Sequence, residues 1–377
     1  MRATVLEDPA LVKLAGRFVW LEIDTEKEGN APFLERYPIQ VWPTFLVVDP
    51  ATEKAVLRWM GTATAPDLTK LLADGERAVK GGEGAGAEEL LARADRANGE
   101  GRTAEAVGLW REALAKGGPG WARRARVLES LALGLQTSRQ EEACASLAVK
   151  EAPGMARVQS FANVVAVGLS CALSGEAAPW ARSAVAALEP LAREAVALPE
   201  VLADDRSGLY EVLVQAREAA KDEAGARKVA GEWWSFLTAE RGRATTPAGR
   251  TMLDAWIVAA ALELGDPARA LPLLEESEKA VPGDYNPPYR IAVLDLELGR
   301  LDDALSANGR ALGLAYGPRK LRVLTQRATI LERKGDKAGA RAALQEAIAF
   351  AGTLPASQRN PRTVERLEAQ LRKLGGG

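Results

Sequence analysis

The first eighty residues alternate between short apolar runs and short amphipathic segments. Residues 18–23 (FVWLEI) and 44–48 (TFLVV) are rich in β-branched and aromatic side chains, so they predict strands. Residues 54–60 (KAVLRWM) alternate between polar and apolar positions, which predicts a further strand, antiparallel to its neighbour. The expected order is helix, strand, helix, strand, strand, helix. The predicted helices lie at 9–16, 30–37 and 65–78.

Beyond residue 87 the hydrophobic pattern changes to alanine and leucine at helical spacing, and no segment predicts a strand. Residues 80–87 (KGGEGAGA) separate the two regions and predict a flexible linker, because they contain four glycines and no large apolar side chain. A motif then recurs in the helical region: a glycine, an alanine five residues later, and then a large residue followed by a small one. The clearest copies are Gly101 with Ala106, Gly265 with Ala270, Gly299 with Ala304, and Gly335 with Ala340.

The last three of these alanines are separated by 34 and 36 residues. This spacing and motif resemble the tetratricopeptide repeat (TPR), which has a period of about 34 residues and consists of two antiparallel helices. The resemblance implies that the alanines let paired helices approach closely and that the glycines turn the chain between them. Weaker copies around Ala143, Ala181 and Ala226 bring the expected array to about seven repeats, and residues 361–374 predict a helix that caps it.

Stacked helix pairs of this kind curve around a concave groove that binds peptides or partner helices. The TPR resemblance therefore predicts protein or peptide partners. Family members that clamp a C-terminal carboxylate use Lys, Arg and Asn at fixed positions of the inner helices, and no such set can be placed here. Arg93, Arg290 and Arg327 fall on the first helices of repeats and are groove candidates, although a solvated surface position explains each more simply.

The first region, residues 5–80, resembles the thioredoxin fold through its element order and its V-W-P-T-F segment. In that family the proline at the position of Pro43 is cis, and the residue before it presents its backbone to an extended substrate peptide. The resemblance marks Val41, Trp42, Pro43 and Thr44 as candidates for peptide binding. The alternative is that Pro43 simply begins a strand, where its missing N–H is harmless.

This region departs from the thioredoxin pattern because it has neither the first strand nor the CxxC motif. The chain's two cysteines, Cys144 and Cys171, lie outside it and are 27 residues apart, and the sequence does not decide whether they pair. Thiol–disulfide exchange needs an attacking thiolate and a resolving thiol. Since loss of the central strand would expose two apolar edges, we expect the natural protein to begin upstream of Met1.

Composition excludes several classes of chemistry. Histidine is absent, which rules out imidazole catalysis and His-ligated zinc. The net charge of −2 lacks the basic excess of a non-specific nucleic-acid binder. No apolar run reaches the ~20 residues of a membrane span, and no motif predicts a metal, a cofactor or catalytic residues.

We therefore expect an α/β thioredoxin-like domain at residues 1–79, a linker at 80–87, an all-α TPR-like solenoid at 88–357, and a capping helix and tail at 358–377. The favoured function is a protein-binding scaffold with a redox-incompetent head that binds peptide. The alternative is a thiol–disulfide oxidoreductase whose CxxC lies upstream of a misassigned start and whose repeats select clients. A cytoplasmic location is the default expectation, unless an export signal also lies upstream.

Overall fold

The computed structural model describes residues 5–6, 8–14, 16–80, 86–176 and 178–375. The chain divides into two compact units, which we describe separately. The first unit comprises Met1–Phe18 and Ile39–Trp233, and the second comprises Val19–Pro38 and Trp234–Gly377. The predicted domain boundaries stay predictions, and residues 81–85 of the expected linker lie outside the described part of the chain.

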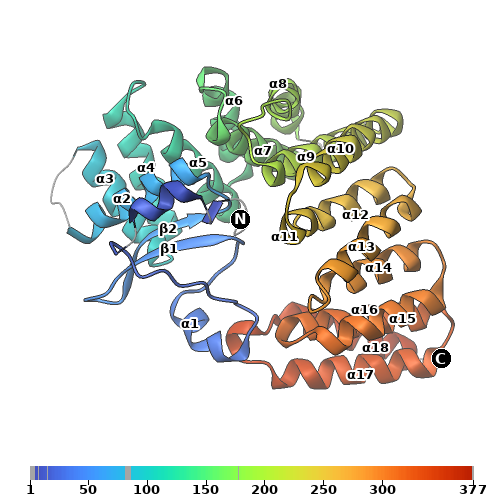
Figure 1. Cartoon of the computed structure of the whole chain (residues 1–377). Helices are drawn as coiled ribbons and strands as arrows, with labels where there is room; N and C mark the ends of the chain where they lie inside the picture. Colours follow the sequence, from blue (N-terminus) through green and yellow to red (C-terminus); the bar gives the residue numbers. More distant parts are fainter. Residues whose placement is uncertain (1–4, 7, 15, 81–85, 177, 376–377) are drawn as a thin grey trace. The chain divides into compact units, whose positions relative to one another are not determined.

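A two-stranded antiparallel sheet lies in the first unit, formed by β1 (Thr44–Asp49) and β2 (Lys54–Met60) (Figure 1). Phe45 stands opposite Trp59, and the register shifts between Val47 and Val48. Helix α2 (Ala65–Lys80) packs on the sheet and buries Leu68, Leu71 and Leu72 with β2 residues such as Leu57. Both strands and this helix lie where the hydrophobic pattern places them.

The strand predicted at residues 18–23 is wrong. Phe18 forms an isolated bridge, and the residues after it have no regular structure, with Val19 88% and Leu21 75% exposed. β-Branched and aromatic residues form a strand only when a neighbouring strand pairs with them. Here the segment from Val19 to Pro38 belongs to the second unit, whereas both strands of the sheet belong to the first.

The two other predicted segments of the N-terminal region are shorter than expected. Residues 9–16 form a 3-10 helix, Pro9–Leu14, and residue 15 lies outside the described residues. Residues 30–37 form α1 (Ala31–Arg36), which lies in the second unit. The fold that is shown is therefore a TPR-like helical solenoid with a small sheet, and this sheet alone does not establish a thioredoxin-like domain.

Helices follow in antiparallel pairs through the rest of the first unit. Helix α3 packs on β2, and the contact is close at Gly99: a Cβ there would lie 2.3 Å from the carbonyl oxygen of Ala55. Helix α10 crosses the division between the units, and its Trp233 is fully buried in the first. The helices are α3 (Ala87–Gly99), α4 (Thr103–Gly117), α5 (Arg124–Thr137), α6 (Glu141–Glu151), α7 (Gln159–Ser174), α8 (Pro179–Ala195), α9 (Ala203–Ala219) and α10 (Glu223–Arg243).

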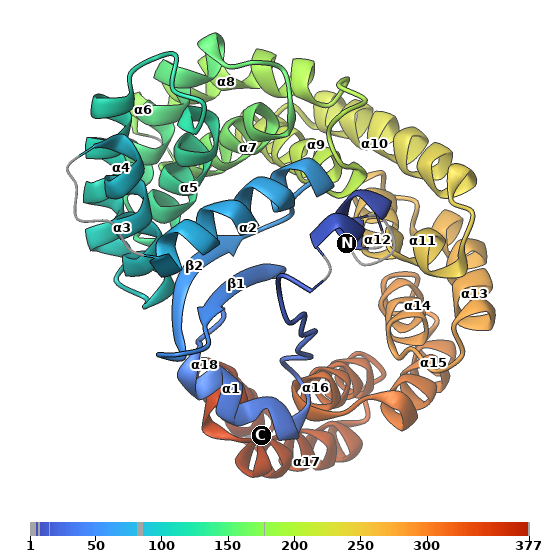
Figure 2. The ribbon, with the colours of Figure 1, turned by 60° about the vertical axis from the view of Figure 1, so that its left-hand side comes forward.

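The second unit continues the pairing: α14 packs on α15, α16 on α17, and α17 on α18, which caps the stack (Figure 2). Helix α1 lies against a short 3-10 helix, Ala356–Gln358, that follows α17. The helices are α11 (Pro247–Thr251), α12 (Asp254–Glu263), α13 (Leu271–Ala280), α14 (Asn286–Glu297), α15 (Leu301–Leu314), α16 (Gly317–Arg333), α17 (Lys337–Thr353) and α18 (Pro361–Gly375).

The recurring glycines and alanines occupy equivalent places in four of these hairpins. Each glycine follows the first helix of its pair and has a positive φ, between +71° and +82°, which glycine adopts without the steric cost of a side chain. Each alanine is fully buried and lies on the second helix of its pair, except Ala270, which lies directly before α13, so the paired backbones can approach closely. The residues are Gly101, Gly265, Gly299 and Gly335, with Ala106, Ala270, Ala304 and Ala340.

The two cysteines form a disulfide in the first unit. Cys144 on α6 and Cys171 on α7 have Cα atoms 6.1 Å apart and an S–S distance of 2.14 Å. Both side chains are buried in the core that α3 to α8 share. The bond therefore joins two helices that are already in contact. None of the helices in the described part of the chain has the length and apolar character needed to span a bilayer.

Candidate peptide-binding site

The residues marked by the thioredoxin resemblance lie just before β1. The Trp42–Pro43 peptide bond is cis, and the Trp42 side chain is 64% exposed. The Thr44 hydroxyl donates a hydrogen bond to the carbonyl of Val41, at 2.6 Å, and the amide of Gly61 donates to the carbonyl of Pro43, at 2.8 Å. A peptide-binding role for this segment stays a prediction.

The three groove candidates do not form one cluster. Arg93 is exposed on α3 of the first unit, whereas Arg290 on α14 and Arg327 on α16 are half-buried in the second. Burial lowers the pKa of Arg290, against the opposing effect of the carboxylates of Asp254 and Asp284. The structure gives these residues positions on the first helices of hairpins, and their role in binding stays a prediction.

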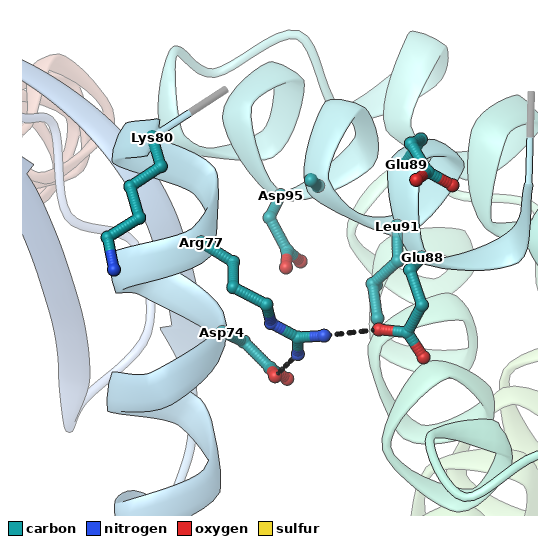
Figure 3. A pocket seen from close by; sticks show the side chains of 8 residues that line it. Asp74, Arg77, Lys80, Glu88, Glu89, Leu91 and Asp95 are labelled. Atoms are coloured by element: carbon teal, nitrogen blue, oxygen red, sulfur yellow. Dashed lines mark hydrogen bonds and ion pairs between the residues drawn. The ribbon is translucent and has the colours of Figure 1, made fainter. Parts of the chain in front are cut away.

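A charged pocket of about 280 Å³ lies between α2 and α3 of the first unit (Figure 3). Arg77 pairs with Asp74 on its own helix and with Glu88, 2.6 Å away, on α3. Arg126 of α5 pairs with Asp95, at 2.9 Å, although burial still raises the pKa of Asp95 to about 6. These ion pairs join α2 to α3 and α3 to α5.

A second polar cluster links α5, α7 and α9 in the first unit. Asn163 donates to Glu129 at 2.5 Å, and Gln159 donates both to Asn163, at 3.0 Å, and to Asp205, at 2.7 Å. The Thr62 hydroxyl also donates to Asp205, at 2.5 Å. Burial raises the pKa of Glu129 to about 8 and that of Asp205 to about 6. No group of three or more acidic or cysteine side chains in the described residues is arranged to hold a metal ion.

The second unit holds a segment of the chain itself, residues 24–31, which we call the bound segment. The Gln358 side-chain amide donates to two of its carbonyl oxygens, those of Thr25 at 3.0 Å and Lys27 at 2.8 Å. The Ser357 hydroxyl donates to the carbonyl of Ala31 at 3.2 Å. These contacts recognise backbone, and they come from the short 3-10 helix after α17, 326 to 333 residues away along the sequence.

Two carboxylates of the bound segment face the N-terminal end of α16, from Tyr316 to Arg322. Tyr316 donates a hydrogen bond to Asp24 at 2.5 Å, and Arg319 lies 3.4 Å from the same carboxylate. Arg319 also donates to Glu26, and Arg322 lies 3.6 Å from Glu26. Burial alone would raise the pKa of Asp24, but the hydrogen bonds from Tyr316 and from the Glu26 amide, with the charge of Arg319, lower it below its ordinary value. The site therefore favours the ionised form of Asp24.

The cationic side chains of this site are positioned by tyrosines. The Arg319 guanidinium lies over the rings of Tyr316, at 4.7 Å, and Tyr285, at 5.6 Å from their centroids. Tyr285 is buried, and its hydroxyl accepts a hydrogen bond from Arg322 at 2.7 Å. Stacking on aromatic faces holds an arginine in a fixed orientation and leaves its N–H groups directed at a carboxylate.

Glycine at position 317 lets the bound segment approach. Gly317 begins α16 with φ +50°, and a Cβ there would lie only 2.1 Å from the carbonyl oxygen of Glu26. The backbone carbonyl cannot rotate away as a flexible side chain could. Any side chain at position 317 would therefore displace the bound segment or the start of α16.

The sequence pattern did not identify this site. Its five main groups are Tyr285, Tyr316, Arg319, Arg322 and Gln358, and they lie in or next to the first two turns of α14 and α16 and in the 3-10 helix after α17. One local signal was present: a tyrosine stands two residues before a proline at the start of both α14 and α16. Nothing in the sequence connects that signal to an acidic segment almost 300 residues earlier.

The comparisons with known proteins agree with the helical-hairpin architecture. The family model "Tetratricopeptide repeat" matches residues 261–319, which include α13, α14 and α15. Residues 261–319 are therefore identified as tetratricopeptide-repeat sequence. No curated protein sequence matches it significantly.

Solved structures with similar folds include a tetratricopeptide repeat protein from Parabacteroides merdae, with a TM-score of 0.50 and 10% identity, over 77% of this chain and 98% of that one. BtubC from P. vanneervenii has a TM-score of 0.42 and 18% identity, over 59% of this chain and 94% of that one. The TPR2AB–pHSP90 complex of yeast Sti1 has a TM-score of 0.28 and 12% identity, over 77% and 98%. Only the first reaches a TM-score of 0.50, and at 10% identity its similarity concerns the fold alone.

Proposed function

We propose that this protein is a scaffold whose TPR hairpins bind peptide segments of partner proteins. The observation that carries the proposal is the bound segment. The helices of the second unit hold it through hydrogen bonds to its backbone and through contacts with its side chains, which is the way a protein surface recognises a flexible peptide. Protein binding is also the common use of stacked helical hairpins.

A displayed library of random peptides, selected against the full chain, tests this function. We expect selected peptides to bind the purified protein in solution with Kd values of about 1–100 μM, which is about −8 to −5 kcal/mol, as measured by calorimetry. Scrambled versions of the same peptides are the control. The proposal fails if no selected peptide binds more tightly than its scrambled version.

We also propose the thioredoxin-like assignment for the sheet region and peptide contact at residues 41–44. The exposed Trp42 ring supports this, because a large apolar side chain on the surface is a common contact in protein interfaces. W42A should weaken a peptide bound there at least ~10-fold while leaving a peptide held by α16 unaffected. Equal affinities of the wild type and W42A for every selected peptide would contradict this second role.

The oxidoreductase alternative receives no support from the described residues. Cys144 and Cys171 are buried and bonded to each other on repeat helices, so neither offers a free thiolate. The alternative places its CxxC upstream of Met1, and it stays a prediction. A cytoplasmic location also stays a prediction.

A further inference from the structure

We propose that Tyr316, Arg319 and Arg322 form a recognition site for acidic segments of partner proteins, and that the chain's own residues 24–31 occupy this site as a built-in competitor. The inference rests on the proposed scaffold function and names the chemistry of one partner segment. That segment carries two carboxylates, two residues apart, in a turn.

Charge and geometry together define this ligand class. The Asp24 carboxylate accepts hydrogen bonds from Tyr316 and from the Glu26 amide, so the side chain both meets the site and shapes its own turn. The Glu26 carboxylate lies between Arg319 and Arg322. Charge-assisted contacts from arginine are among the stronger polar contacts in proteins, and two of them at fixed spacing select for spacing as well as charge. The site thus recognises side-chain carboxylates within a polypeptide and does not require a C-terminal carboxylate.

The remaining contacts suit any sequence of that shape. Gln358 and Ser357 bind carbonyl oxygens, which every residue offers, and Gly317 leaves space for the backbone at Glu26. The specificity therefore comes from the two acidic positions. A partner with the same acidic turn can replace the bound segment without loss of any of these contacts.

Covalent attachment makes the bound segment an effective competitor. A tethered ligand has an effective concentration of the order of millimolar, so a free acidic peptide must exceed this value to displace it. Arg319 keeps 25% and Arg322 50% of its side-chain surface exposed, so solvent and salt weaken these contacts and allow exchange. The wild-type chain should therefore bind acidic peptides weakly, and release of its own segment should increase the affinity.

Fluorescence polarisation with a labelled peptide of residues 20–32 tests the proposal. The full-length variant D24N/E26Q weakens the bound segment and should bind this peptide at least ~10-fold more tightly than the wild type. Adding R319E and R322E should abolish the gain. Adding R333E, on the same helix but paired with Glu297, is the matched control and should leave the gain intact. Circular dichroism verifies that each variant keeps its helices.

A second peptide of residues 20–32, carrying D24K and E26K, should fail to bind the D24N/E26Q variant. Because this control changes the peptide and not the protein, it does not depend on how any further variant folds. The proposal is overturned if the wild type and D24N/E26Q bind the acidic peptide with equal affinity. It is also overturned if the D24K/E26K peptide binds D24N/E26Q as tightly as the acidic peptide does, or if the variant with R319E and R322E added keeps the affinity of D24N/E26Q. A wild-type dimer in size-exclusion chromatography that D24N/E26Q dissociates would identify a second copy as the occupant, and would also overturn it. If library peptides still bind other surfaces, the scaffold function survives these results.

Discussion

At the scale of single residues, burial of the Glu129 carboxyl makes the stability of the fold depend on pH. Its side chain on α5 is buried, and burial, against the hydrogen bonds from Asn163 and Ser160, raises the pKa of the carboxyl from 4.5 to about 8. The folded chain therefore keeps a proton that the unfolded chain has lost over this range. Stability from this group falls as the pH rises from about 4.5 to about 8, because the folded state binds more protons there than the unfolded state.

The variant E129Q should remove this dependence. Glutamine keeps the shape and the acceptor oxygen for Asn163 but cannot ionise, so the free energy of unfolding at pH 9 should rise by about 2–4 kcal/mol relative to the wild type. At about pH 4, below both pKa values, the two proteins should be equally stable. Urea unfolding at both pH values measures the effect, with E142Q at an exposed position of α6 as the control. If E129Q and E142Q raised the free energy of unfolding at pH 9 by equal amounts, the raised pKa of Glu129 would be contradicted.

At the scale of elements, local rules predicted the helix hairpins and failed for the N-terminal segment. Gly299 and Ala304 mark a turn and a close helix contact, and both requirements arise within one hairpin, so the sequence carries them directly. A strand at 18–23 depends on a partner elsewhere in the chain, which the pattern does not report. For the same reason the contact between Glu26 and Arg319, 293 residues apart, could not be predicted.

The Cys144–Cys171 bond provides a prediction about the α6–α7 pair. The bond closes a loop of 27 residues, and restricting the unfolded chain in this way stabilises the folded state by about 3 kcal/mol. We expect C144S/C171S to lower the unfolding free energy by about this amount and to make it insensitive to dithiothreitol.

The control for this prediction is the wild type with and without reductant. Thiol titration of the unfolded wild type should find no free thiol. Two free thiols in protein taken directly from cells would contradict a stable bond, and would favour a reducing compartment such as the cytoplasm.

At the scale of the whole molecule, one short segment connects the repeats to a region far away in sequence. Residues 19–38 belong to the second unit, although the residues on both sides of them belong to the first. Within this unit, residues of α16 and of the 3-10 helix after α17 contact residues 24–31 of the same chain. The central claim is that this contact is peptide recognition by the second unit.

Trypsin cleavage after Lys27 in the native protein measures this contact most directly. The Lys27 carbonyl is held by Gln358, so cleavage requires release of the segment, and the rate reports how often release occurs. G317A places a Cβ against the Glu26 carbonyl, whereas G335A also puts alanine at a positive φ, just after α16, where its Cβ has nothing within 4 Å. We predict slow cleavage of the wild type and G335A and at least ~10-fold faster cleavage of G317A, which corresponds to about 1.4 kcal/mol. Equal rates for G317A and G335A, or cleavage of the wild type as fast as that of a free peptide of residues 20–32, would contradict the account.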